Sequence, residues 1–324
     1  MPTLAKPDRS CTPSRTRSRR RSWWWWGRHA LTLLFIAVVV LLLAEQVTKI
    51  DWSKVLQALK AYTGWTLAAA AGLTMVSHLL FGGFDQLGRR YVGSPLRPAQ
   101  VAVVAGICYA FTLNMGALIG GIAFRYRLYS RLGLAAPDIT KIYALSVLSN
   151  WLGYLILLGA LLLAGAVHVP PRWGIPAGLL PVLGVACWAL VAGYAAMCAG
   201  VGRRRFTLKG VPIEWPGWRM ALVQGGMSIA NWLIMGWIIH LFIGGRVDYP
   251  TILGVMLLSA VAGALTHVPA GLGVLEAVFL TLLAGALPPY EILAALLAYR
   301  AIYYLCPLVP AVAAYAVLEA RARR

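Results

Sequence analysis

The stretch Thr266–Leu280 reads T-H-V-P-A-G-L-G-V-L-E-A-V-F-L and lies within an otherwise apolar segment, residues 251–286. A proline and two glycines interrupt any helix there, because proline lacks a backbone donor and glycine destabilises a helix interior. A carboxylate, Glu276, follows at once. A charge at the centre of a membrane costs at least about 2.5 kcal/mol. The stretch therefore predicts a segment that turns back within a membrane, beside a carboxylate that serves or balances a charged path.

The composition of the whole chain is that of a membrane protein. Of its 324 residues, 60% are hydrophobic and 12% are charged, whereas a soluble domain has about 25% charged residues. Backbone polar groups in lipid must be satisfied within each segment, which predicts helices. We therefore expect an all-α polytopic membrane protein. Its apolar segments are 30–47, 64–84, 99–124, 139–167, 177–200, 220–243, 251–286 and 291–318.

The distribution of basic residues predicts which segments cross the membrane. If all eight cross, Lys and Arg divide almost evenly between the two sides. If 99–124 and 251–286 each enter and leave on one side, 23 of the 29 basic residues face one side and 5 the other, with Arg300 inside the last segment. The positive-inside rule then favours about six full spans and two re-entrant helical hairpins, with both termini cytoplasmic.

Each predicted hairpin has helix-breaking residues near its middle. Irregular backbone at membrane depth is tolerated only where protein or a water-filled cavity covers it. The longer segment, 251–286, could instead form two short tilted spans. Both of its ends would still lie on the same side of the membrane. The predicted break residues are Asn114, Gly116, Gly120 and Gly121 in the first hairpin, and Pro269, Gly271 and Gly273 in the second.

The two hairpins open to opposite sides, and each lies between two full spans. This arrangement predicts an inverted-topology repeat, the layout of many secondary transporters. We expect one integral membrane domain at 29–318, between a basic, disordered cytoplasmic tail at 1–28 and a short cytoplasmic tail at 319–324. The segment 30–47 ends without a signal-peptidase pattern, so we expect it to be an uncleaved first span.

Two intramembrane charges, Glu276 and Arg300, are natural partners for each other. Either they form a structural ion pair that locks the second hairpin, or they line a path for a charged group, and both can hold. The half-helix that begins after Gly271 offers free N–H groups that suit a phosphate or a carboxylate. Glu276 lies in its first turn and could occupy that position itself.

Three arginines follow the first hairpin in F-R-Y-R-L-Y-S-R, residues 124–131. Arg125, Arg127 and Arg131 alternate with tyrosines at the expected cytoplasmic interface. Arginine binds phosphate oxygens in a bidentate manner, so the cluster suits capture of a lipid headgroup; the alternative is ordinary positive-inside charge. We expect Asp85 to pair with one of these arginines.

Two spans share an Asn-Trp-Leu triplet that begins at Asn150 and at Asn231. Both asparagines fall near mid-depth, where they could contact a polar substrate. Hydrogen bonds between helices, worth about 0.6–2 kcal/mol each, are the favoured interpretation.

Other function classes lack support in the sequence. The net charge of +19 comes from short loops and a basic tail, which argues against nucleic acid as a partner. The cysteines lack metal-binding spacing, and we expect no metal and no cofactor. The chain carries no nucleotide-binding or hydrolase motif, so we expect that it is not an enzyme. The oligomeric state stays open.

Three stretches carry a family resemblance: H-V-P-A-G-L-G-V-L-E-A (267–277), Y-R-L-Y-S-R-L-G-L (126–134) and Ala298-Tyr299-Arg300. They resemble the lysylphosphatidylglycerol synthase transmembrane-region family, over residues 29–318, in a stand-alone member from a bacterial inner membrane. Many members carry Pro-Gly-Gly where this chain has Ala270 in the middle, and the Cβ of alanine disfavours a very close backbone approach there.

The resemblance implies a flippase that moves aminoacylated phosphatidylglycerol between leaflets, without the soluble domain that makes this lipid. Glu276, Arg300 and the arginines of 125–131 match the family motifs. We therefore expect a translocator of anionic or aminoacylated phospholipid, whose partner is an anionic headgroup. The alternatives are a small-solute or ion transporter, and a non-transporting membrane partner of a lipid-synthesis complex.

Overall fold

The computed structural model describes residues 51–167, 176, 178–200, 205–208, 211–266 and 271–322. The predicted tail 1–28, the predicted first span 30–47 and the break residue Pro269 lie outside the described residues. The chain is an all-α polytopic membrane protein. Among the described residues, seven helices are long and apolar enough to cross a membrane.

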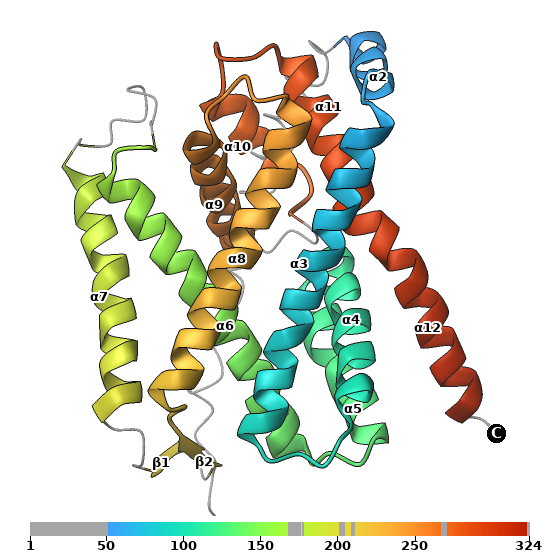
Figure 1. Cartoon of the computed structure of the whole chain (residues 1–324), viewed down its shortest axis with the longest axis vertical. Helices are drawn as coiled ribbons and strands as arrows, with labels where there is room; N and C mark the ends of the chain where they lie inside the picture. Colours follow the sequence, from blue (N-terminus) through green and yellow to red (C-terminus); the bar gives the residue numbers. More distant parts are fainter. Residues whose placement is uncertain are drawn as a thin grey trace, which may run out of the picture.

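Five of these seven are the expected full spans, and Figure 1 shows them running along the length of the molecule. The last one is continuous through a π-helical segment. The five are α3 (Gly64–Tyr91), α6 (Ala136–Leu163), α7 (Leu179–Gly200), α8 (Trp218–Ile243), and the run α11 (Pro289–Tyr299), η4 (Arg300–Leu305) and α12 (Cys306–Ala322). Two short strands, β1 (Arg205–Leu208) and β2 (Val211–Glu214), pair antiparallel between α7 and α8.

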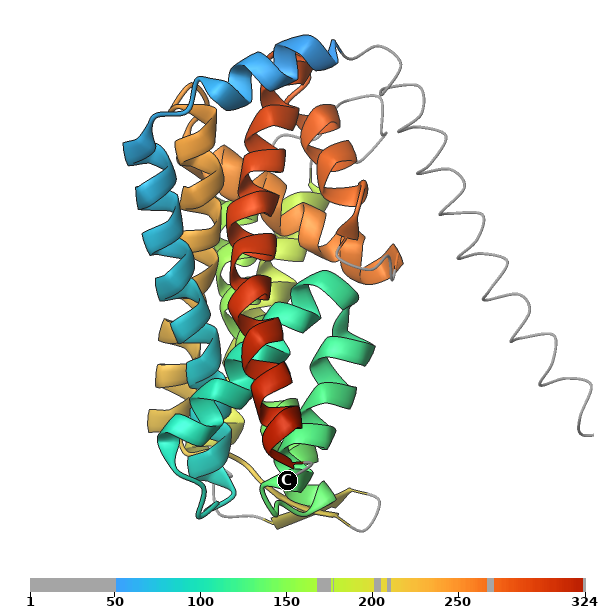
Figure 2. The ribbon, with the colours of Figure 1, turned by 90° about the vertical axis from the view of Figure 1, so that its right-hand side faces the viewer.

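The other two helices begin the predicted hairpins. Helix α4 (Pro98–Met115) is followed by the π-helical segment η1 (Ala117–Ala123) and by α5 (Phe124–Arg131), which returns along it. Helix α9 (Tyr249–Thr266) is followed by α10 (Val274–Leu282). At 18 residues each, α4 and α9 reach about 27 Å. Figures 1 and 2 show the two hairpins in opposite halves of the molecule, as predicted.

The turn of the first hairpin depends on glycine. Gly116 ends α4 with a φ of 85°, which side chains with a Cβ rarely adopt. At Gly120 a Cβ would lie 2.1 Å from the backbone nitrogen of Thr112 and 2.2 Å from the carbonyl carbon of Phe111. The returning segment therefore packs directly on the backbone of α4, which explains why this part of the sequence is rich in glycine.

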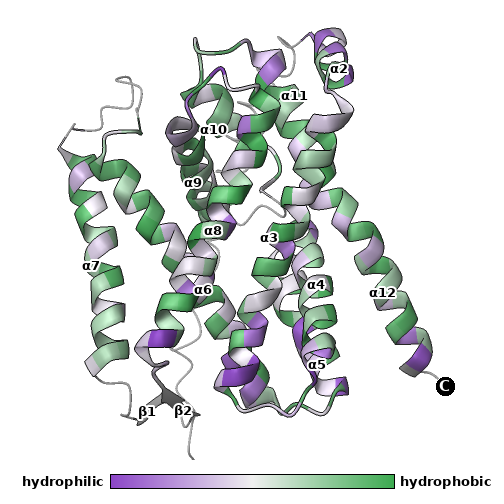
Figure 3. Ribbon diagram, in the orientation of Figure 1, coloured by the Kyte–Doolittle hydropathy of each residue, from purple (hydrophilic) through white to green (hydrophobic). Residues whose placement is uncertain are grey.

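The two ends of the molecule differ in charge. The turn 92–97, the turn 132–135, the β-hairpin and the C-terminus lie at one end, which we call the basic end. Figure 3 shows hydrophilic residues gathered there on α3, α5 and α12. Helix α2 (Trp52–Lys60) and the turns after α8 and α10 lie at the other end. The loops that the positive-inside rule assigns to the cytoplasm thus share one end.

A close crossing of two spans offers a test of this packing. A Cβ at Gly153 on α6 would lie 2.4 Å from Ser228 Oγ and 2.5 Å from the nitrogen of Ile229 on α8. Gly153→Ala should therefore lower the free energy of unfolding by about 1–3 kcal/mol, the cost of overpacking. Thermal unfolding in detergent would measure this. Gly72→Ala on α3, where a Cβ meets nothing within 4 Å, is the matched control; an equal loss there would contradict the close crossing.

Candidate functional site

An ion pair joins the second hairpin to the last span. Arg300 Nε donates to Glu276 Oε1 at 2.5 Å, and a terminal nitrogen of Arg300 donates to Glu276 Oε2 at 3.1 Å. The two side chains are 11% and 12% exposed. The predicted partnership is thus present, in the bidentate geometry that gives the strongest charge-assisted hydrogen bonds.

The same two side chains hold the break in the hairpin. The backbone N–H of Gly273 donates to Glu276 Oε2 at 3.0 Å, so the carboxylate caps the start of α10. Arg300 also donates to the carbonyl oxygen of Gly271 at 3.0 Å. Gly271 and Gly273 have φ values of 56° and 79°, which glycine tolerates best. The pair therefore locks the hairpin, and a role in lining a path stays a prediction.

The first hairpin reaches the same region from its own end. Asn114, near the end of α4, donates to the carbonyl oxygen of Tyr304 at 3.1 Å and to that of Ala110 at 2.9 Å. Tyr304 belongs to η4, and the guanidinium of Arg300 lies 5.4 Å from the centre of its ring. The two hairpins therefore meet at η4. Such π-helical segments are frequent at functional sites.

A cavity of about 340 Å³ lies between the hairpins at this meeting point. Its walls come from α4, α8, α9, the start of the returning hairpin, and the junction of α11 with η4. Thr112, Ser259 and Tyr304 give it polar groups, and Trp232 gives it apolar surface. Gly271 lines it as well, so the backbone that Arg300 holds forms part of the wall.

The two predicted asparagines differ in their contacts. Asn231 is buried, and its Oδ1 accepts a hydrogen bond of 2.6 Å from Ser77 on α3. Ser77 lies 2.7 Å from the hydroxyl of Tyr303, which lies 2.7 Å from that of Tyr109. For Asn150, the backbone carbonyl accepts from Ser228 and Trp232. The side chain of Asn231 thus joins two helices, as the favoured interpretation expects. The contacts at Asn150 use its backbone carbonyl, which any residue would offer, so the role of the Asn150 side chain stays a prediction.

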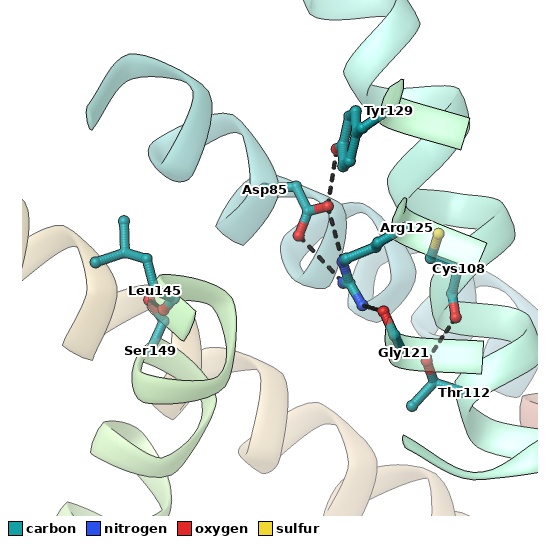
Figure 4. A network of polar contacts seen from close by, with 8 residues as sticks. All are labelled: Asp85, Cys108, Thr112, Gly121, Arg125, Tyr129, Leu145 and Ser149. Atoms are coloured by element: carbon teal, nitrogen blue, oxygen red, sulfur yellow. Dashed lines mark hydrogen bonds and ion pairs between the residues drawn. The ribbon is translucent and has the colours of Figure 1, made fainter. Parts of the chain in front are cut away.

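The structure separates the three arginines that the sequence groups together. Arg125 is 2% exposed and pairs with Asp85, which is fully buried; both hydrogen bonds between them measure 3.1 Å (Figure 4). Arg125 also donates to the carbonyl of Gly121, and Tyr129 donates to Asp85 at 2.8 Å. The predicted pairing of Asp85 is therefore confirmed. The grouping of Arg125 with the exposed arginines is wrong, because residues two apart face opposite sides of a helix.

Arg127 and Arg131 lie together at the basic end, one helical turn apart. Both bind Glu319 near the end of α12, at 2.9 Å and 2.6 Å. A pocket of about 490 Å³ adjoins them, with Gln100, Arg131 and Arg321 at polar positions and apolar side chains of α4 and α12 elsewhere. The sequence analysis missed Glu319 and Arg321. Their opposite charges at the end of the last span could have indicated that they interact with the nearby arginines.

Comparisons with known proteins agree with this architecture. A family model described as lysylphosphatidylglycerol synthase TM region matches residues 30–311. The inner membrane protein YbhN of Escherichia coli (strain K12) is 45% identical over 277 residues, which cover 85% of this chain and 87% of that protein. An uncharacterized Synechocystis protein, slr0712, is 30% identical over 267 residues, which cover 79% and 80%.

Proposed function

This chain belongs to the lysylphosphatidylglycerol synthase transmembrane-region family, and we propose that it moves phospholipid between the leaflets of a bacterial inner membrane. The Escherichia coli relative is an inner membrane protein by name, which supports this location. The observation that carries the proposal is the cavity between the two hairpins, which lies beside the Glu276–Arg300 pair where both hairpins meet η4.

The proposed route begins at the basic end. A headgroup in the cytoplasmic leaflet meets Arg127 and Arg131, whose charges are shared with Glu319, and the adjoining pocket supplies Arg321. Arginine suits the phosphate because its planar group binds two oxygens at once. Arg125 has no direct part in this step, because it is buried against Asp85 and supports the returning helix of the first hairpin.

The headgroup then passes the cavity between the hairpins while the acyl chains stay in lipid. The volume of about 340 Å³ is at the lower end of the range for small-molecule sites, about 300–1,000 Å³, and is compatible with a headgroup. The Glu276–Arg300 pair lies directly behind the cavity wall: Arg300 holds the backbone of Gly271, which lines the cavity, and Glu276 neutralises the charge of Arg300. A neutral pair offers hydrogen bonds without the net charge that would hold an anion too long. The sequence carries no ATP-binding motif, so the proposed movement is passive or coupled to an ion gradient.

Headgroup-labelled phosphatidylglycerol in proteoliposomes tests the proposal. We expect the label to cross to the outer leaflet at least about tenfold faster than in empty liposomes, because the polar route removes much of the cost of bringing a charge through lipid. Accessibility of the label to an impermeant reductant is the measurement. Liposomes that contain an unrelated helical membrane protein are the control. No movement above that control, across several anionic lipids, would favour a solute transporter or a non-transporting partner.

A further inference from the structure

A second polar pocket lies at the end of the molecule opposite the basic end. It has a volume of about 630 Å³ and lies between α2, the C-terminal end of α8 and the start of α11. Figure 2 shows α2 lying across this end of the helical bundle. The sequence analysis assigned no function to this region, and neither hairpin lines the pocket.

Two cations and one carboxylate line the pocket: Lys54, Arg246 and Glu291. Arg246 forms an ion pair with Glu291, and Lys54 lies 3.5 Å from Asp51 and 5.9 Å from the ring centre of Tyr290. Lys54 and Arg246 are about half exposed, at 57% and 51%, whereas Glu291 is 20% exposed. The charges that a ligand can reach are therefore mainly positive.

An uncharged hydrogen bond connects two of the other residues that line the pocket. Tyr62, between α2 and α3, donates to the backbone carbonyl of Phe242 at 3.0 Å. Burial raises the pKa of Tyr62 to about 12, so its hydroxyl stays protonated and keeps this hydrogen bond at physiological pH. The bond ties the end of α8, which carries Arg246 just beyond it, to the segment that carries Lys54.

The pocket also lies at the level expected for lipid headgroups. In α2 the apolar residues Trp52, Val55, Leu56 and Leu59 recur at helical spacing; Val55 is buried, while Trp52 and Leu56 are 47% and 58% exposed. Trp65, at the start of α3, is 81% exposed. Exposed tryptophan and an amphipathic helix across a bundle end are typical of the membrane interface. Lipid rather than bulk solution is therefore the nearest source of a ligand.

We propose that this pocket binds the phosphate of an anionic phospholipid headgroup in the leaflet opposite the basic end, with Lys54 and Arg246 as the phosphate ligands. The inference rests on the proposed function, since it names where a translocated headgroup is held after the crossing. The residues that line the pocket carry one more positive than negative charge, which matches a single phosphodiester. A headgroup with two additional amines brings net positive charge and is disfavoured, so the geometry points to anionic rather than lysine-esterified lipid.

Glu291 tunes this site because it competes with the phosphate for Arg246. Removing the carboxylate by Glu291→Gln frees Arg246 and should tighten phosphate binding, whereas Arg246→Gln should weaken it by about tenfold, the effect of losing one charge-assisted hydrogen bond. Opposite effects from two partners in one ion pair separate ligand binding from a purely structural role, in which both variants would weaken the local fold.

Protection of Lys54 from acetylation tests the site with a reporter inside it. The full chain in a neutral maltoside detergent is treated with an acetylating reagent, and mass spectrometry compares Lys54 with Lys60, which is exposed on the same helix outside the pocket. The ligand arms are dioctanoyl phosphatidylglycerol, dioctanoylglycerol without phosphate, and inorganic phosphate. The protein variants are wild type, Arg246→Gln, Glu291→Gln and, as the distant control, Arg219→Gln at the exposed start of α8.

We expect phosphatidylglycerol to slow acetylation of Lys54 but not of Lys60, and dioctanoylglycerol to slow neither. Half-protection should need about tenfold more lipid in Arg246→Gln, less lipid in Glu291→Gln and the same amount in Arg219→Gln. Equal protection of both lysines, or protection that survives Arg246→Gln unchanged, would overturn the site. Protection by inorganic phosphate at the same concentration would overturn the lipid as its ligand. If the lipid protects Lys54 but the protein does not translocate lipid, the proposed function is rejected while the binding site stands.

Discussion

Arg125→Met is expected to lower the free energy of unfolding by about 3–5 kcal/mol, because it leaves the carboxylate of Asp85 buried without its cation. Asp85 is fully buried and, among the described residues, would keep only the hydrogen bond from Tyr129. The variant would also lose the bond from Arg125 to the carbonyl of Gly121, which holds the returning segment of the first hairpin. Thermal unfolding in detergent, followed by size-exclusion chromatography, would measure the remaining folded fraction.

Two further variants test whether the unpaired buried charge of Asp85 causes this loss of stability. Arg127→Met, two residues along the same helix, removes a cation that is 50% exposed and should cost no more than about 1 kcal/mol. The double variant Arg125→Met with Asp85→Asn removes both charges and should recover part of the loss, since coupled partners are not additive. Equal losses for Arg125→Met and Arg127→Met, or no recovery in the double variant, would show that the ion pair is not what stabilises this region.

The arrangement of spans and hairpins could be predicted because it depends on two local signals. Charge bias between loops assigns sides, and glycine, asparagine and proline mark where a helix must end. Both signals can be read from short stretches of sequence; the residues that end a helix, for example, lie between Asn114 and Gly121. The same logic placed Glu276 and Arg300 close together, since a buried charge needs a partner and few candidates exist within the membrane.

Other features depend on contacts that no single stretch contains. No local pattern in the sequence of η4 distinguishes it from an α-helix, and the approach of Asn114 to the carbonyl of Tyr304 spans 190 positions. The inward orientation of Arg125 could have been found, because Arg127 and Arg131 are four residues apart and share a face that excludes it. The pocket beside α2 is not predicted from the apolar segments, because residues 48–63 fall between two of them, although apolar residues of α2 repeat at helical spacing.

Translocation itself should be lost when either charge of the central pair is removed. Glu276→Gln leaves Arg300 as a net cation beside the cavity, where an anionic headgroup would be held too tightly to leave. Arg300→Gln removes the cation and also the donor to the carbonyl of Gly271, so the wall of the cavity loses its support. Each change affects at least one charge-assisted hydrogen bond, and we expect the rate to fall by about tenfold or more.

The double variant Glu276→Gln with Arg300→Gln distinguishes two roles of the ion pair: stabilising the hairpin, and contacting the headgroup during translocation. It carries no unpaired charge, and the amide oxygen introduced by Glu276→Gln can still accept from the N–H of Gly273, so the hairpin should be more stable in thermal unfolding than in either single variant. It stays below wild type because the bond from Arg300 to the carbonyl of Gly271 is lost. If the pair only locks the hairpin, translocation in proteoliposomes should return toward the wild-type rate. If Arg300 contacts the passing headgroup, the double variant should stay folded but slow. We expect the second result, because Arg300 holds the backbone of Gly271, which lines the cavity where the two hairpins meet. A double variant that is folded and translocates lipid at the wild-type rate would show that the pair does not contact the headgroup.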